Sequence, residues 1–263
     1  MSDHRATLGA VVSGTSSSRG AGEKVVGVIG GMGPAASVDF LARIVRATPA
    51  RDDADHIRVL LDNNPKVPSR IARILEGGGE DPLPVLIAMA RGLQAQGADF
   101  LAIPCNTAHF YLPDIARAVD IPVLDMVGLA IEKLTALRPQ PGRIGMLASP
   151  AVRTLGLYAA RLAAAGMTAL FPDATGEAVV LGVIRAVKAG AVTAAHRAEY
   201  AAVANALVES GAQALLIACT ELSVLGIPER CGRAAVDALD ALVEASVMTA
   251  LGAARVSNGS QVA

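Results

Sequence analysis

The sequence has little of what several large protein classes need. Aromatic residues make up 3% of its 263 residues and tryptophan is absent, which argues against a base-stacking surface for single-stranded nucleic acid. The formal net charge is −1, so we expect no electrostatic attraction to nucleic acid or to an anionic membrane surface. Hydrophobic residues reach 52%, but alanine supplies most of the excess and no run of about 18 consecutive apolar residues occurs. We therefore expect a soluble protein with no nucleic-acid or membrane partner.

Cysteine is also scarce. The three cysteines, Cys105, Cys219 and Cys231, are an odd number and show no Cys-x-x-Cys spacing. This is the pattern of neither a disulfide framework nor a zinc ribbon, and it suits a reducing cytoplasm. We expect a cytoplasmic protein with no metal and no cofactor. Cys231 has no counterpart elsewhere in the chain and is interpreted as a bystander.

Short apolar runs alternate with segments of helical periodicity from Val25 onward. Runs of this kind, bounded by Gly and Pro, indicate parallel strands that are buried on both faces. The sequence therefore predicts an α/β protein with doubly wound parallel sheets. The expected strands lie at 25–29, 57–61, 100–103, 122–124, 143–147 and 214–217. Helices are expected at 35–47, at 84–96 and through Tyr158 and Leu162.

Two segments more than a hundred residues apart repeat one pattern. Residues 97–107 and 211–221 each read Gly-Ala, an apolar run, a cysteine and then a threonine, with the same spacing from glycine to cysteine. Gly27 and Gly145 also lie at similar distances before these cysteines. We infer an internal duplication, which gives two similar α/β domains related by pseudo-twofold symmetry.

The predicted organisation has four parts. Residues 1–24, rich in Ser, Gly and Thr, are expected to be a disordered extension, and 255–263 a flexible tail. The first domain takes 25–124 together with 237–254, and the second takes 125–236. The segment after Asp237 has no recognised partner in the first half. It is expected to form a helix over 238–251 that returns to pack on the first domain.

Both repeated cysteines fall at the carboxyl end of a predicted strand, where open α/β sheets bind their ligands. Asn106, Thr107 and Thr220 follow them, residue types suited to capping a helix whose free N–H groups face an anion. A single strand-end cysteine is usually a small buried hydrophobe. Two cysteines at matching positions of a duplicated chain instead predict a pair of thiols that reach one substrate carbon from its two faces. One removes a proton as thiolate, and the other returns a proton from behind as thiol.

The glycine-rich turn over 30–36 allows more than one interpretation. It weakly matches the Gly-x-Gly-x-x-Ala form of the dinucleotide fingerprint, and Asp62 could serve as the ribose-binding acid. However, Pro34 removes an N–H where a pyrophosphate would need one, and a nucleotide would not explain the paired thiols. We favour a turn, with Met32 in it, that lines the site of a small anion. A purely structural turn and a nucleotide- or anion-binding module with inert cysteines stay as alternatives.

Four motifs, taken together, resemble the aspartate/glutamate racemase superfamily and most closely its aspartate racemase branch. They occur in the expected order between about Val25 and Leu251. The resemblance implies a cofactor-independent, pyridoxal-independent racemase with two bases, forming a homodimer, with its active site between two similar domains. The motifs are Gly27-Val28-Ile29-Gly30-Gly31-Met32-Gly33-Pro34, Asn63-Asn64-Pro65, Pro104-Cys105-Asn106-Thr107-Ala108-His109 and Ala218-Cys219-Thr220-Glu221.

The resemblance also implies roles for individual residues. Cys105 and Cys219 match the two catalytic thiols, Arg70 matches an arginine that binds a substrate carboxylate, and Lys188 matches a substrate-binding lysine. One cation at each end would fit a small dicarboxylic amino acid, although from the residues alone both would be read as surface charges. The residues that match those around the α-carboxylate are Asn106, Thr107 and Thr220.

Some choices stay open in the sequence. Ser69 stands where the family usually has Asp before Arg70, which leaves the substrate open between aspartate and glutamate. Glu221 is expected either to assist Cys219 electrostatically or to cap a helix. His109 is expected either to activate Cys105 or to brace the start of a helix. Other chemistries of the superfamily, such as hydantoin racemisation or cis–trans isomerisation, are the nearest functional alternatives.

Overall fold

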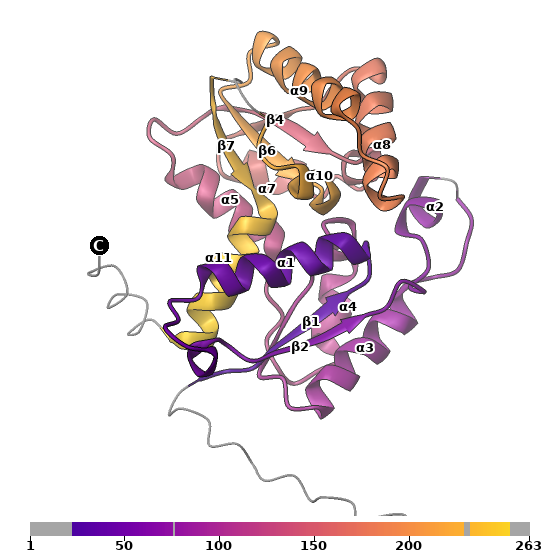
Figure 1. The fold of residues 1–263 in the computed structure, drawn as a ribbon. Coiled ribbons are helices and arrows are strands. Elements are labelled where there is room, and N and C mark those ends of the chain that lie inside the picture. The colour runs from indigo at the N-terminus through magenta and orange to yellow at the C-terminus, as the bar shows by residue number, and fades with distance from the viewer. Residues whose placement is uncertain (1–22, 76, 229–231, 253–263) are drawn as a thin grey trace, which may run out of the picture.

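The computed structural model describes residues 23–75, 77–228 and 232–252. The expected tail and nearly all of the expected N-terminal extension lie outside these ranges, as does Cys231. The described chain forms two α/β units, stacked one above the other in Figure 1, with helices lying between them. None of the helices in the described ranges combines the length and apolar character needed to cross a bilayer.

The first sheet has three parallel strands in the order β2-β1-β3. All five residues of β1 are buried, as expected for a strand covered on both faces. The register pairs Val26 with Val59 on one side and with Phe100 on the other. The elements are β1 (Val26–Gly30), α1 (Pro34–Ala47), β2 (Val59–Asn63), α3 (Leu83–Ala95) and β3 (Phe100–Ala102).

The second sheet has four parallel strands in the order β5-β4-β6-β7. Its strands and two longest covering helices are β4 (Arg143–Ala148), β5 (Thr168–Leu170), α8 (Ala174–Lys188), α9 (Ala194–Glu209), β6 (Ala214–Ala218) and β7 (Ala234–Asp237). Two sheets built from parallel strands and covering helices confirm the predicted α/β class. The shorter elements are η1 (Asp53–Asp55), α2 (Arg70–Leu75), η2 (Thr107–Tyr111), α4 (Leu112–Arg117), α6 (Pro150–Thr154), α7 (Ala159–Ala164) and α10 (Thr220–Leu225).

Matched glycines in the two central strands support the duplication. A Cβ added to Gly27 would lie 2.7 Å from Leu101 Cδ2 and 2.8 Å from Ala98 Cβ. A Cβ added to Gly145 would lie 2.7 Å from Leu215 Cδ2 and 3.1 Å from the Cβ of the alanine that matches Ala98. These distances are shorter than ordinary van der Waals contacts. Each unit therefore needs glycine at the same point, so that the neighbouring strand (β3 or β6) and the turn before that strand can pack closely.

The C-terminal segment does have a partner in the first half, contrary to expectation. Val123 forms an isolated parallel bridge with Leu101 of β3, in the place that β7 takes beside β6. Helix α5 (Met126–Ala136) follows this bridge, and α11 (Ala238–Leu251) follows β7. The strand predicted over 122–124 is thus only a single bridge at Val123, and β7 was not predicted at all, so the equivalence could not be recognised from the sequence.

Helices α5 and α11 connect the two units. Helix α11 packs against α1 of the first unit and against α5, while α5 also contacts β7 and α7 of the second unit. In Figure 1, α11 leaves the upper unit after β7 and runs past α1 into the lower unit. Helix 238–251 and its packing on the first unit are therefore confirmed, whereas the domain boundaries stay a prediction.

The chain around Tyr158 differs from the predicted continuous helix. Helix α6 ends at Thr154, α7 begins at Ala159, and Tyr158 lies in the turn between them. Gly156 takes φ = +61° within this turn, a left-handed conformation that ends a helix and that glycine adopts without steric cost. The break leaves the Tyr158 side chain in the core.

One hydrophobic core joins the two units. It contains Val26 and Phe100 from the first sheet and Ile144 and Leu216 from the second, together with buried residues of α5 and α11. Two smaller cores lie under the outer helices, one in each unit. The contact between the units is thus continuous apolar packing, and the polar site is built at its edge.

Candidate active site

The two repeated cysteines line one cavity between the units. Cys219 follows β6 directly, and Cys105 follows β3 after Ile103 and Pro104. Both thiols are free and buried, with 4% of Cys105 and 6% of Cys219 exposed. The carboxyl ends of the two sheets therefore face a common site, as the duplicated sequence predicts.

The two thiols and all seven substrate-binding residues proposed from the sequence line the same cavity. The space between them is about 20 Å³, which is room for roughly one water. Entry of an amino acid therefore requires the surrounding side chains to move apart. The residues from the sequence analysis that line it are Met32, Arg70, Cys105, Asn106, Thr107, Lys188, Cys219, Thr220 and Glu221.

Each thiol has a polar partner two residues further along the chain. Cys105 Sγ lies 3.4 Å from the hydroxyl of Thr107, and Cys219 Sγ donates to Glu221 Oε2 at 3.2 Å. Burial, followed by the neighbouring Glu221 carboxylate, raises the pKa of Cys219 well above its usual value. The matched positions thus differ in charge: a neutral hydroxyl accompanies one thiol and a carboxylate accompanies the other.

His109 braces the backbone of Cys105. Its Nε2 accepts a hydrogen bond from Met126 N–H at 3.0 Å, which places the proton on Nδ1, and Nδ1 donates to the Cys105 carbonyl at 2.9 Å. The ring is buried, and this burial lowers the pKa of His109, so the imidazole is neutral. His109 therefore ties the first thiol's backbone to the start of α5 and is not among the residues that line the cavity.

Ser223 occupies the matching place in the second unit. Its hydroxyl lies 3.4 Å from the Cys219 carbonyl and donates to Asp237 Oδ1 at 2.6 Å. Asp237 caps α11 through Leu239 N–H, as Asp125 caps α5. In both units, a side chain four residues after the thiol connects it to the helix that crosses between the units.

Arg70 is a buried cation with no counter-charge among the described residues. It is 8% exposed, and its Nη atoms donate to the carbonyls of Pro68 at 3.0 Å and Met32 at 3.2 Å. In the part of the chain that the structure describes, no carboxylate pairs with Arg70, and its buried Nε has no partner. An uncompensated buried charge is costly, and an anionic ligand would offset that cost.

Lys188 and Glu221 face each other at the edge of the cavity. Lys188 is the last residue of α8, and its Nζ lies 3.6 Å from Glu221 Oε1, with 39% and 8% of the two side chains exposed. The more exposed lysine can swing while the carboxylate stays fixed beside Cys219. Lys188 is therefore positioned to exchange Glu221 for a carboxylate that enters the cavity.

Asn106 does not cap the following helix as expected. The short η2 turn begins after Asn106 without a side-chain capping bond. Its side-chain oxygen is instead bound within the core, and its buried Nδ2 has no partner among the described residues. A free amide donor in the wall of the cavity suits a carboxylate.

The glycine-rich turn packs against the loop after β2. Gly31 has φ = +90°, and a Cβ there would lie 2.2 Å from the Asn64 backbone. Glycine is thus required for contact within the protein, which explains it without a bound dinucleotide. The turn brings Met32 to the cavity wall, consistent with the interpretation that it lines the site.

Sequence reasoning missed Ser149, which also lines the cavity and is 4% exposed. Ser149 directly follows β4, as Gly31 directly follows β1. Aligning the two strand ends through Gly27 and Gly145 would have found it, because ligand sites in such sheets gather residues from several strand ends.

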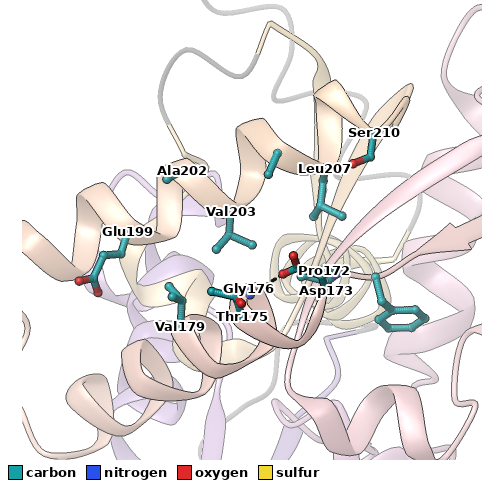
Figure 2. A pocket seen from close by; sticks show the side chains of 12 residues that line it. Pro172, Asp173, Thr175, Gly176, Val179, Glu199, Ala202, Val203, Leu207 and Ser210 are labelled. Atoms are coloured by element: carbon teal, nitrogen blue, oxygen red, sulfur yellow. Dashed lines mark hydrogen bonds between the residues drawn. The ribbon is translucent and has the colours of Figure 1, made fainter.

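A second and larger pocket lies between α8 and α9 (Figure 2). Its volume is about 360 Å³. Val179, Val203 and Leu207 give it an apolar wall, and Asp173 caps α8 by accepting from Gly176 N–H at 2.8 Å. Neither thiol and none of the other residues proposed from the sequence lines this pocket, so the smaller cavity is the candidate active site.

The chain is similar to known racemases. The family model described as Asp/Glu/Hydantoin racemase matches residues 29–246. The broad specificity amino-acid racemase RacX of Bacillus subtilis (strain 168) is 28% identical over 123 residues, which cover 45% of this chain and 51% of RacX. The chain thus matches about half the length of that relative.

Solved structures give the same result over a longer span. The aspartate racemase of Picrophilus torridus is 29% identical, with a TM-score of 0.77 over 87% of this chain and 94% of that one. Glutamate racemase isoform RacE1 of Bacillus anthracis is 16% identical, with a TM-score of 0.60 over 88% and 84% of the two chains, which is a likeness of fold alone. Because the family model spans most of the sequence, this chain belongs to the Asp/Glu/hydantoin racemase family.

Proposed function

We propose that the protein is a cofactor-independent racemase of an acidic amino acid, aspartate first and glutamate second. Cys105 and Cys219 act as its two bases. The observation that carries the proposal is that two free thiols, from matched positions in two similar units, line a single cavity. A metal or nucleotide site would not need this pairing.

In the proposed reaction, one cysteine as thiolate removes the α-proton from one face of the substrate. The electron pair left on the α-carbon delocalises into the carboxylate, and the other cysteine as thiol protonates the carbon from the opposite face. The configuration is inverted, and the two sulfurs have exchanged protonation states. Cys219, whose thiol donates to Glu221, suits the role of proton donor in the direction in which Cys105 removes the proton. Cys105, beside the Thr107 hydroxyl, suits the base, because that hydroxyl can donate to a thiolate.

The charges around the cavity support an acidic substrate. Arg70 lacks a counter-charge within the described chain and Lys188 lies at the cavity edge, so each can bind one carboxylate. Ionising an ordinary thiol at pH 7 costs only about 2 kcal/mol. Removing a proton next to a carboxylate is much harder, so donors around that carboxylate must lower most of the barrier. Asn106, with its free amide N–H, is one such donor, and Glu221 can accept from the substrate ammonium group.

The first test is proton exchange at the α-carbon. Incubation of L-aspartate with the protein in D₂O should give α-deuteration and loss of optical rotation, and a panel of other amino acids compared in the same assay would rank the substrates. Cys105→Ser and Cys219→Ser should each abolish racemisation. Cys231→Ser makes the same chemical change outside the duplicated pattern and should keep wild-type turnover. The two-thiol mechanism is wrong if Cys105→Ser and Cys219→Ser both retain full turnover.

The proposal includes a homodimer in the cytoplasm. Both described thiols are free, and a mechanism that uses them needs a reducing compartment. Helix α1 exposes Val38 and Val45, at 58% and 47%, on a face that a second copy could cover. Light scattering coupled to size-exclusion chromatography should give twice the chain mass of 26.7 kDa. A monomer at assay concentration would remove this part of the proposal.

A further inference from the structure

We propose that Tyr158 is a positioning residue, which orients the Asn106 amide so that its NH₂ group points into the cavity. The Tyr158 hydroxyl donates to Asn106 Oδ1 at 2.5 Å in a buried bond. The two residues come from different units, because Asn106 follows β3 and Tyr158 lies between α6 and α7. This inference rests on the proposed function, since it assigns the amide to a substrate carboxylate.

The tyrosine is held firmly and remains a donor. Its side chain is 1% exposed and belongs to the core that joins the two units. Burial also raises the pKa of Tyr158 far above its usual value, so the hydroxyl keeps its proton throughout the working range. Because the buried Tyr158 hydroxyl can only donate to an acceptor, it selects the amide orientation in which Asn106 Oδ1 faces it.

The other half of the amide is what the site uses. With Oδ1 held by Tyr158, Nδ2 must point the opposite way, and it is buried without a partner among the described residues. Asn106 also lines the cavity. Without the hydroxyl, the amide can turn over, because its last torsion is broad and roughly two-fold. Its oxygen would then face the carboxylate and repel it.

The first half of the sequence carries a phenylalanine at the spacing of Tyr158, although Phe40 lies inside α1 and Tyr158 lies in a turn. Phe40 follows Gly27 at the spacing at which Tyr158 follows Gly145, and both rings are buried in the shared core. Thr220 takes the place of Asn106 in the second unit. Tyr158→Phe therefore removes only the hydroxyl that binds Asn106 and keeps a buried aromatic ring of the kind that the shared core also has at Phe40.

The test compares Tyr158→Phe, Asn106→Ala and the double variant. Two readouts are used: racemisation kinetics, and calorimetric binding of succinate, an achiral diacid that needs no turnover. We expect Tyr158→Phe to lower kcat/KM and succinate affinity each roughly tenfold or more. The fall in kcat should exceed the rise in KM, because the carboxylate gains negative charge in the transition state. The double variant should be no worse than Asn106→Ala within about threefold.

Two further variants act as controls. Tyr200→Phe removes a hydroxyl from another buried tyrosine of the second unit and should change neither readout. Asn106→Asp keeps the acceptor for Tyr158 but replaces the donor with an oxygen, so it should lose succinate binding although the tyrosine bond remains. Asn106→Asp also tests the amide if Tyr158→Phe folds poorly.

The outcomes separate this inference from the proposed function. Wild-type kcat/KM and succinate affinity in Tyr158→Phe would overturn it, as would losses that multiply in the double variant. If no amino acid exchanges its α-proton but succinate binds with the expected non-additive losses, the racemase proposal fails and the role of Tyr158 stands. If the wild type neither exchanges α-protons nor binds succinate, both are overturned.

Discussion

Cys105 and Cys219 occupy matched positions, yet their nearest polar neighbours differ in charge. Thr107 offers a hydroxyl and Glu221 a carboxylate, each two residues after its cysteine. A carboxylate beside a thiol opposes formation of the thiolate. The duplicated scaffold thus surrounds its two thiols unequally, and in the proposed mechanism this difference assigns Cys219 as the first proton donor and Cys105 as the first base.

Glu221→Gln tests this asymmetry. Removing the carboxylate should lower the pKa of Cys219, so the pH midpoint of its alkylation by iodoacetamide should move to lower pH by about one unit or more. Peptide mass spectrometry distinguishes Cys219 from Cys105 and Cys231. Glu177→Gln, a change on α8 at a carboxylate paired with Arg153, is the control. An unmoved midpoint would mean that burial alone sets the pKa of Cys219.

His109 makes stability depend on pH. Because its pKa is lowered in the folded protein, the unfolded chain takes up a proton below about pH 6.5 that the native state does not bind. The free energy of unfolding should therefore fall as the pH drops from about 6.5, by up to about 1.4 kcal/mol per pH unit from this group.

His109→Gln isolates that contribution, since the amide can still donate and accept but does not titrate. Urea denaturation at several pH values from 7 to 5 should show the wild type losing stability faster than the variant. Parallel curves would show that the histidine is not buried as a neutral ring.

At the scale of elements, the two central strands place the same steric demand on the chain. Gly27→Ala and Gly145→Ala should each destabilise the protein by about 1–3 kcal/mol. In each case the added methyl group would clash with a leucine of the neighbouring strand and an alanine just before that strand. Gly182→Ala on α8, where no heavy atom lies within 4 Å of the new Cβ, should instead stabilise by up to about 1 kcal/mol. Thermal or urea unfolding measures all three. Strongly unequal effects at Gly27 and Gly145 would argue against equivalent packing in the two units.

Several strands and helices could be predicted from the sequence, because apolar runs and helical periods report burial directly, but the two longest helices, α8 and α9, were not predicted. The predicted strand over 100–103 is observed as Phe100–Ala102, and the predicted helix over 84–96 as Leu83–Ala95. The match between α5 and α11 was missed because no strand was predicted over Ala234–Asp237, where β7 lies, while the strand predicted over 122–124 is reduced to one bridge at Val123. The break before Tyr158 also escaped detection, since a helical pattern does not reveal which glycine takes a positive φ.

At the scale of the whole molecule, the shared core couples the two units. Residues from both sheets belong to one apolar cluster. Helix α11 contacts α1 as well as β6 and β7, and α5 contacts β7 and α7 while its Met126 N–H donates to His109 of the first unit. Separating the units would expose this surface, so neither is expected to unfold alone.

We therefore predict a single cooperative unfolding transition in urea. Far-UV circular dichroism and tyrosine fluorescence should give coincident curves, since Tyr111 reports on the first unit and Tyr158 and Tyr200 on the second. The midpoint should rise with protein concentration if the chain is a homodimer. Two resolved transitions would show that the core does not join the units energetically.

The sequence by itself determined the α/β class, the duplication and the two thiols of the candidate site, because strand burial and repeated motifs are local properties of the chain. Arg70 and Lys188 were assigned from the family resemblance, and Ser149 was missed. The tertiary structure decided what surrounds those residues. It gave Arg70 no counter-charge in the described chain, set Lys188 against Glu221, and brought Tyr158 to Asn106. Such contacts join segments that are distant in sequence, and their geometry depends on how the two units pack, which no local pattern encodes.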